Sequence, residues 1–78
     1  MSEERAEELG FTPLGTLTGY AYAGCDPARM GLGPSFAIAA AEKETGLKLD
    51  DAELIEINEA FAAQTLAVMK SVDRKSVV

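Results

Sequence analysis

The pattern of apolar and polar positions predicts five elements in the order helix, strand, helix, strand, helix. Residues 14–23 and 53–57 carry many β-favouring side chains and are predicted to be strands. Residues 2–9, 34–45 and 59–71 have the length and spacing of helices. Strands that alternate with helices of this length are typical of a parallel sheet with right-handed crossovers. The predicted fold class is therefore α/β.

Residues at the ends of the predicted helices support these boundaries. Ser2 is a suitable N-cap for the first helix, and Gly10 can adopt the left-handed conformation that ends it. Pro34 fits the first turn of the second helix, where its missing N–H group costs nothing. Gly46 is a natural end of that helix, and Asp50-Asp51 predicts a tight turn before the second strand.

The third predicted helix is apolar around nearly its whole circumference. Its apolar residues are Ala60, Phe61, Ala62, Ala63, Leu66, Ala67, Val68 and Met69. A helix of this kind belongs in the interior of a larger body. A chain of 78 residues also buries only about 60% of its unfolded surface. We therefore expect the chain to require a partner surface.

Composition restricts the possible classes of function. One cysteine, Cys25, and no histidine rule out an internal disulfide and a Cys/His metal site. A net charge of −6 argues against nucleic acid as a partner, because phosphates are held mainly by Lys and Arg. The sequence has no apolar run of about 18 residues and no secretory signal pattern. These features predict a cytoplasmic chain that does not enter the membrane.

Asn58 and Glu59 form a polar pair between a predicted strand and a predicted helix. Ligands of open α/β sheets bind beyond the carboxyl ends of the strands, so Asn58 is a candidate to hold a water or an oxyanion. Simple N-capping by Asn58 would also explain its place. Glu59 is a candidate acid or base, but compensation of the helix dipole in the first turn explains its position better.

Met30-Gly31-Leu32-Gly33-Pro34 is a glycine loop that opens a helix. A dinucleotide fingerprint requires a third glycine where Phe36 stands, so this loop is not such a motif. The glycines permit close approach to a ligand, although an ordinary tight connection would also use them. Cys25 lacks a base to activate it and is interpreted as a small loop residue.

Two motifs in this order resemble the C-terminal half of thiolases, the family of acetyl-CoA acetyltransferases and 3-ketoacyl-CoA thiolases. They are AGCDPARMGLGP at 23–34 and NEAFA at 58–62, separated by GLKLDDAELIE. The similarity runs from about residue 3 to residue 72. It implies that residues 1–78 are one partial thiolase C-terminal domain. The implied structure is a βαβα portion of a mixed, mostly parallel sheet, preceded by a short helix.

The resemblance implies an acyltransferase that joins or cleaves acyl-CoA thioesters, with the thioester as substrate and no resident cofactor. In the family, the asparagine of NEAFA holds a water that helps to form an oxyanion hole, which implies this role for Asn58. The phenylalanine of the same motif and the methionine of the glycine loop line the acyl pocket. These positions correspond to Phe61 and Met30.

The family's nucleophilic cysteine and its catalytic histidine have no counterpart in these 78 residues. We therefore expect a fragment that is inactive alone and that binds the rest of a thiolase or forms a homo-oligomer. An alternative is a non-catalytic interaction module, derived from a thiolase, that docks onto a complete acyltransferase. An autonomous CoA-binding protein is a third hypothesis, which the acidic charge disfavours because only Arg29 lies near the glycine loop.

Overall fold

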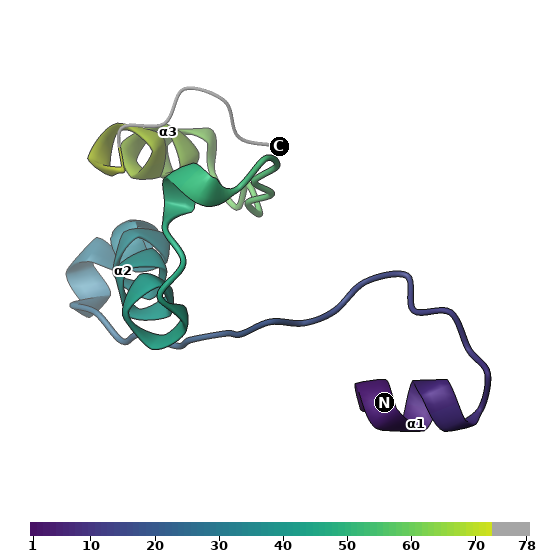
Figure 1. Cartoon of the computed structure of the whole chain (residues 1–78). Helices are drawn as coiled ribbons and strands as arrows, with labels where there is room; N and C mark the ends of the chain where they lie inside the picture. Colours follow the sequence, from purple (N-terminus) through teal and green to yellow (C-terminus); the bar gives the residue numbers. More distant parts are fainter. Residues whose placement is uncertain (73–78) are drawn as a thin grey trace.

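The computed structural model describes residues 1–72, which form three α-helices and two short 3-10 helices. The elements are α1 (Glu3–Glu8), η1 (Pro27–Leu32), α2 (Gly33–Thr45), η2 (Leu49–Asp51) and α3 (Ala62–Ser71). α3 lies over α2, whereas α1 stands apart at the end of a long connecting segment (Figure 1).

Local signals account for both ends of α1. The Ser2 hydroxyl accepts a hydrogen bond from the Arg5 backbone N–H at 3.1 Å and thereby caps the first turn. Gly10 follows the helix with a φ of 71°, the left-handed conformation that glycine adopts without steric cost. Both features were predicted from the sequence and are confirmed.

The second predicted helix is confirmed as α2, which begins at Gly33 with Pro34 in its first turn. It ends at Gly46, whose φ is 74° and whose N–H donates to the Glu42 carbonyl oxygen at 2.9 Å. This left-handed end is the αL form of C-cap. The residues around Pro34 and Gly46 therefore define this helix on both sides.

The segments around α2 are more ordered than the sequence indicated. Residues predicted to be a glycine loop contain η1, which the Asp26 carboxylate caps by accepting from the Ala28 N–H at 3.0 Å. The predicted acidic turn is confirmed as η2. There the Lys48 N–H donates to Asp51 Oδ2 at 2.8 Å, so the turn closes on its own side chain.

The predicted strands over 14–23 and 53–57 are not strands within the described residues. Neither segment has a neighbour with which to form a ladder of backbone hydrogen bonds, and a strand exists only as part of such a ladder. The predicted βαβα sheet is therefore not confirmed. Every residue from 14 to 20 is exposed, so the first of these segments lies without cover.

The packed part of the chain consists of η1, α2 and α3, which contact one another. Val68 of α3 is 2% exposed and lies at its centre. Ala6, which is 6% exposed, is the other buried apolar residue among those described. Large apolar side chains elsewhere stay exposed, including Phe36 at 51% and Leu66 at 65%. In the described part of the chain, no helix is both long and apolar enough to span a bilayer.

Candidate functional site

The start of α3 differs from the prediction. The helix begins at Ala62 instead of residue 59, and its N-cap is Phe61, in an extended conformation with φ −144° and ψ 141°. Asn58 therefore does not cap α3, and Glu59 does not lie in its first turn. The Asn58 carbonyl oxygen accepts from the Ala60 N–H at 3.0 Å, so the chain turns here before the helix starts.

A cavity of about 280 Å3 lies between η1 and the start of α3. It brings together Met30, Asn58 and Phe61, the three residues predicted for the site. Its remaining walls are Gly31, Pro34, Ile57, Ala60 and Gln64. The contact between η1 and α3 thus gathers residues that are far apart in the sequence.

The walls of this cavity are open to solvent on one side. Met30 is 67% exposed and Phe61 is 66% exposed, so these large apolar side chains form a rim. The Asn58 side chain is exposed and makes no hydrogen bond within residues 1–72. An amide that faces an apolar cavity without a partner is able to bind a water or a ligand oxygen.

Gln64 is a polar residue of the cavity that the sequence analysis did not select. Its Oε1 atom is buried and accepts no hydrogen bond from the described residues. The signal for Gln64 in the sequence was its position as a lone amide in an almost wholly apolar helix. The close approach of Gln64 also explains why position 31 is a glycine. A Cβ atom at this glycine would lie 3.2 Å from Gln64 Cγ, which is closer than such contacts normally are.

Cys25 packs against the glycine loop and lies outside the cavity. Its Sγ atom is 4.0 Å from the Arg29 carbonyl oxygen, a weak hydrogen bond that helps to close η1. A Cβ atom at Gly33 would lie 3.8 Å from the same sulfur, an ordinary van der Waals distance. These contacts agree with the interpretation of Cys25 as a small structural loop residue.

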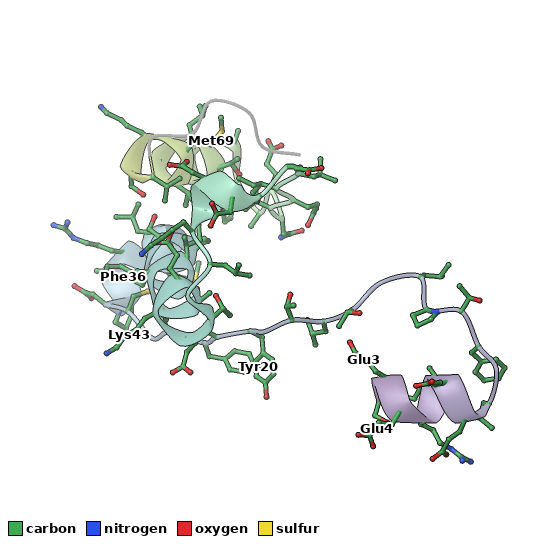
Figure 2. All side chains as sticks on the ribbon, in the orientation of Figure 1. Glu3, Glu4, Tyr20, Phe36, Lys43 and Met69 are labelled. Atoms are coloured by element: carbon green, nitrogen blue, oxygen red, sulfur yellow. The ribbon has the colours of Figure 1, made fainter. Side chains whose placement is uncertain are left out.

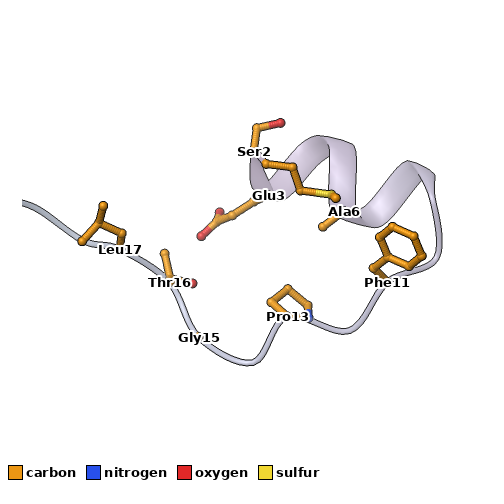
Figure 3. Close-up of a pocket in the computed structure, with 9 residues that line it drawn as sticks. Ser2, Glu3, Ala6, Phe11, Pro13, Gly15, Thr16 and Leu17 are labelled. Carbon is orange, nitrogen blue, oxygen red and sulfur yellow. The ribbon is translucent and has the colours of Figure 1, made fainter.

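Two other cavities contain none of the predicted site residues. One, of about 510 Å3, lies between α1 and the segment that follows it, where Ala6 and Phe11 face Pro13 and Leu17 (Figure 3). Its walls are mostly apolar, and Leu17 is 81% exposed. This cavity is a wide bend of the chain, because side chains from only one turn of helix border it.

The second is an apolar cavity of about 380 Å3 between the connecting segment, α2 and α3. Tyr20 lies beside α2, and Met69 projects from α3 (Figure 2). Ile38, Ile55 and Val68 complete its apolar lining. With few polar atoms to orient a ligand, this cavity has the character of a core that is only partly filled.

The chemistry of the Asn58 cavity is therefore that of two amides among apolar walls. Within residues 1–72, no group of three or more Asp, Glu, Cys or His side chains is placed to hold a metal ion. Amides are neutral donors and acceptors, so the site can orient a carbonyl oxygen and stabilise charge that develops on it. It contains no nucleophile and no general base.

Comparison with protein families gives a match to the family described as "Thiolase, C-terminal domain" over residues 11–77. The mitochondrial 3-ketoacyl-CoA thiolase of Rattus norvegicus is 54% identical over 72 residues, which are 92% of this chain and 18% of that protein. The 3-ketoacyl-CoA thiolase of Hahella chejuensis is 51% identical over 78 residues, which are 100% of this chain and 20% of that protein.

Solved structures give the same result. The acetyl-CoA acetyltransferase of Bacillus anthracis matches with a TM-score of 0.92 and 52% identity, over 96% of this chain and 19% of that chain. The enzyme of the same description from Syntrophomonas wolfei matches with a TM-score of 0.86 and 44% identity, over 94% and 18% of the two chains. These neighbours support the α/β class. The chain spans about a fifth of the length of the relatives that it matches.

Proposed function

This chain belongs to the thiolase family, and from that premise we propose that it supplies part of the active site of an acyltransferase that joins or cleaves acyl-CoA thioesters. Asn58 contributes to the oxyanion hole, and Met30 and Phe61 line the acyl pocket. The substrate is a coenzyme A thioester, and no resident cofactor takes part. The family match over residues 11–77 is the basis for this assignment.

The observation that carries the proposal is the convergence of Met30, Asn58 and Phe61 on one cavity. Met30 comes from η1, whereas Asn58 and Phe61 come from the segment that leads into α3. Asn58 and Phe61 are neighbours in the sequence, whereas Met30 reaches the same cavity from a distant segment, so its position there is the informative observation. Their common location supports a single binding site for the acyl group.

The chemical role of Asn58 follows from its side-chain amide. Its NH2 group donates to a water, and that water donates to the thioester oxygen as negative charge develops there. Once the remainder of a thiolase covers the cavity, the apolar walls from Met30 and Phe61 would lower the local dielectric, and such donors then stabilise charge more strongly than in water. The Asn58 amide makes no hydrogen bond within residues 1–72, so it is available for this task.

We propose that residues 14–23 and 53–57 become strands when the remainder of a thiolase lies beside them. The exposure of the first segment supports this, because its backbone groups and its side chains Leu17 and Tyr22 lack cover. The βαβα portion of the sheet would then form on both sides of α2. A strand is stable only when a neighbour completes its hydrogen bonds.

The nucleophilic cysteine and the catalytic base must come from the rest of a thiolase or from another copy of the chain. Exposed apolar side chains support a large covering partner, since Phe36 is 51%, Phe61 is 66% and Leu66 is 65% exposed. Exposed apolar groups of this kind mark protein interfaces. We expect no thiolysis from the chain alone.

The test replaces the matching segment of the Bacillus anthracis acetyl-CoA acetyltransferase with this chain, and thiolysis of acetoacetyl-CoA is then measured. The graft is expected to be active. Asn58→Ala in the graft should lower kcat roughly 100- to 1,000-fold, the usual loss when one oxyanion-hole donor is removed.

Glu59→Ala is the matched control, because Glu59 is the exposed neighbour of Asn58 and does not line the cavity. It should leave kcat within about twofold, as expected for a surface position away from the site. An active graft that keeps its full kcat with Asn58→Ala would disprove the role of Asn58.

A second candidate function is the interaction module that docks onto a complete acyltransferase. Leu66 of α3 is 65% exposed and favours this candidate, because docking would cover its side chain. The graft separates the two hypotheses. A chain that binds the intact Bacillus enzyme tightly, but gives an inactive graft, would support the module and contradict the contribution to the active site.

A further inference from the structure

Two cavities of the packed region share part of their walls. The cavity with Asn58 has a volume of about 280 Å3, and the apolar cavity between the connecting segment, α2 and α3 has a volume of about 380 Å3. Pro34 and Ile57 line both cavities. A residue that borders two cavities lies between them. The two cavities therefore adjoin, and Pro34 and Ile57 form the partition.

The two residues of the partition differ in what their side chains do. Pro34 lies in the first turn of α2, where its ring fixes the backbone at the start of the helix. Ile57 comes from the segment before Asn58 and contributes a branched apolar side chain that is half-buried. Truncation of Ile57 would therefore connect the two cavities and leave the start of α2 unchanged.

We infer that Ile57 determines the specificity of the site for the length of the acyl group: it confines that group to the smaller cavity, so the substrates are coenzyme A thioesters of short acyl groups. This inference rests on the function proposed above for the Asn58 cavity and deepens it by naming the substrate class. A cavity of about 280 Å3 is small, since pockets that enclose drug-sized ligands begin at about 300 Å3.

The larger cavity is suited to a longer chain that Ile57 keeps out. Its lining is apolar apart from Tyr20 and Glu56, and it includes Val68, which is 2% exposed. A methylene chain has no polar atoms that need partners, and each of its methylene groups stabilises the complex only when it is buried. With Ile57 in place, a longer acyl chain cannot reach these apolar walls.

The active graft tests this role of Ile57. The quantity to measure is kcat/KM for 3-ketooctanoyl-CoA divided by kcat/KM for acetoacetyl-CoA. Ile57→Ala should raise this ratio at least about tenfold, the size of effect that a change of one methylene group has in an apolar pocket. Ile55→Ala is the matched control, because Ile55 is half-buried like Ile57 but lines only the larger cavity. It should leave the ratio within about twofold, as expected for a residue away from the partition.

A milder pair of variants makes the same comparison with less risk to folding. Ile57→Val removes one methylene group and should raise the ratio about two- to fourfold, whereas Ile55→Val should not change it. An unchanged ratio in Ile57→Ala and Ile57→Val, or equal increases at both positions, would overturn the inference. Failure of the role proposed for Asn58 is a separate result, since it appears as full kcat in Asn58→Ala.

The full chain gives a measurement that does not require activity. Of its three methionines, Met30 lines the smaller cavity, Met69 the larger one and Met1 the cavity beside α1. In carbon-13 NMR of the methionine methyl groups, octanoyl-CoA should shift the signal of Met30 alone in the natural sequence. In Ile57→Ala it should shift the signals of Met30 and Met69. Acetyl-CoA should shift only Met30 in both chains, and Met1 should not respond.

The methyl signals also separate the two ways in which the inference can fail. A Met69 signal that does not respond to octanoyl-CoA in Ile57→Ala, while Met30 does respond, would disprove the role of Ile57 and leave the proposed acyl pocket standing. A Met30 signal that responds to neither thioester would contradict the acyl pocket itself, and the inference would fall with it.

Discussion

The first 24 residues and the following 48 described residues show two different ways in which a chain becomes ordered. In the first region, α1 is a helix of 6 residues whose ends are set by its own side chains. The connecting segment after it is exposed throughout residues 11–20. In the second region, η1, α2 and α3 pack against one another around Val68.

The difference shows where a binding site can be built. A site needs groups from separate segments held at fixed positions, and in the second region η1, α2 and α3 contact one another. The cavity with Met30, Asn58 and Phe61 lies there. The cavity beside α1 is bordered by residues that are close in sequence, such as Ala6 and Phe11, and gathers no predicted site residue.

Of the substitutions that test this difference between the two regions, Val68→Asp should have the largest effect on stability. Val68 is 2% exposed, so the substitution places a carboxylate without a partner in the packed region, at a cost of roughly 3–5 kcal/mol. Amide hydrogen exchange of α3 and η1, measured by NMR, should lose its protection. Exchange in α1 should stay as it was.

Leu17→Asp is the matched control in the first region, since Leu17 is 81% exposed. Its cost should be within about 0.5 kcal/mol, the range for exposed positions without special contacts. If Val68→Asp also exposed the α1 amides to exchange, the two regions would form one cooperative unit. The contrast drawn between them would then be wrong.

A glycine that follows a helix can be replaced by alanine in each region, and the expected loss of stability is intermediate. Gly10 and Gly46 have φ values of 71° and 74°, and a Cβ atom at either meets nothing within 4 Å. Alanine there costs about 1–2 kcal/mol from the left-handed backbone alone. Gly46→Ala should lower the urea midpoint of the packed region, as followed by circular dichroism. Gly10→Ala should shorten α1 without moving that midpoint.

Gly24→Ala controls for the removal of a glycine as such, because Gly24 has neither a left-handed φ nor close neighbours. It should leave the midpoint unchanged or raise it slightly, through a smaller entropy of the unfolded chain. Equal shifts for Gly24→Ala and Gly46→Ala would mean that the left-handed conformation is not the cause.

Features that depend on a few neighbouring residues could be predicted from the sequence. Ser2, Gly10, Pro34 and Gly46 act on helix ends within one turn of themselves, and the structure has α1 and α2 where these residues predicted them. Asn58 was a candidate from its position between two elements, whereas Met30 and Phe61 came from the resemblance to thiolases. The structure adds that the motifs meet at one cavity.

Features that depend on distant neighbours could not be predicted in the same way. The apolar alternation of residues 53–57 is typical of a strand, but a strand also needs a partner that these 72 residues do not provide. The start of α3 depends on Phe61, whose extended backbone places it at the cavity next to η1. N-cap preference alone favoured Asn58. Gln64 was missed because its burial depends on the approach of Gly31.

Arg5→Gln should have the smallest effect and gives the most stringent test of how separate the regions are. Arg5 and Glu8 form an ion pair of 2.9 Å, but their side chains are 60% and 64% exposed, so water and salt weaken it. Its loss should cost at most about 0.5 kcal/mol and slightly reduce the Cα chemical shifts that report α1 helicity. Glu8→Gln removes the same ion pair by neutralising its acidic partner. Its effects on stability and on these chemical shifts should equal those of Arg5→Gln. Since α1 is held by contacts within its own turns, protection of the α3 amides should not change in either variant. A change there would mean that the first region stabilises the packed one, and therefore also the cavity at Asn58.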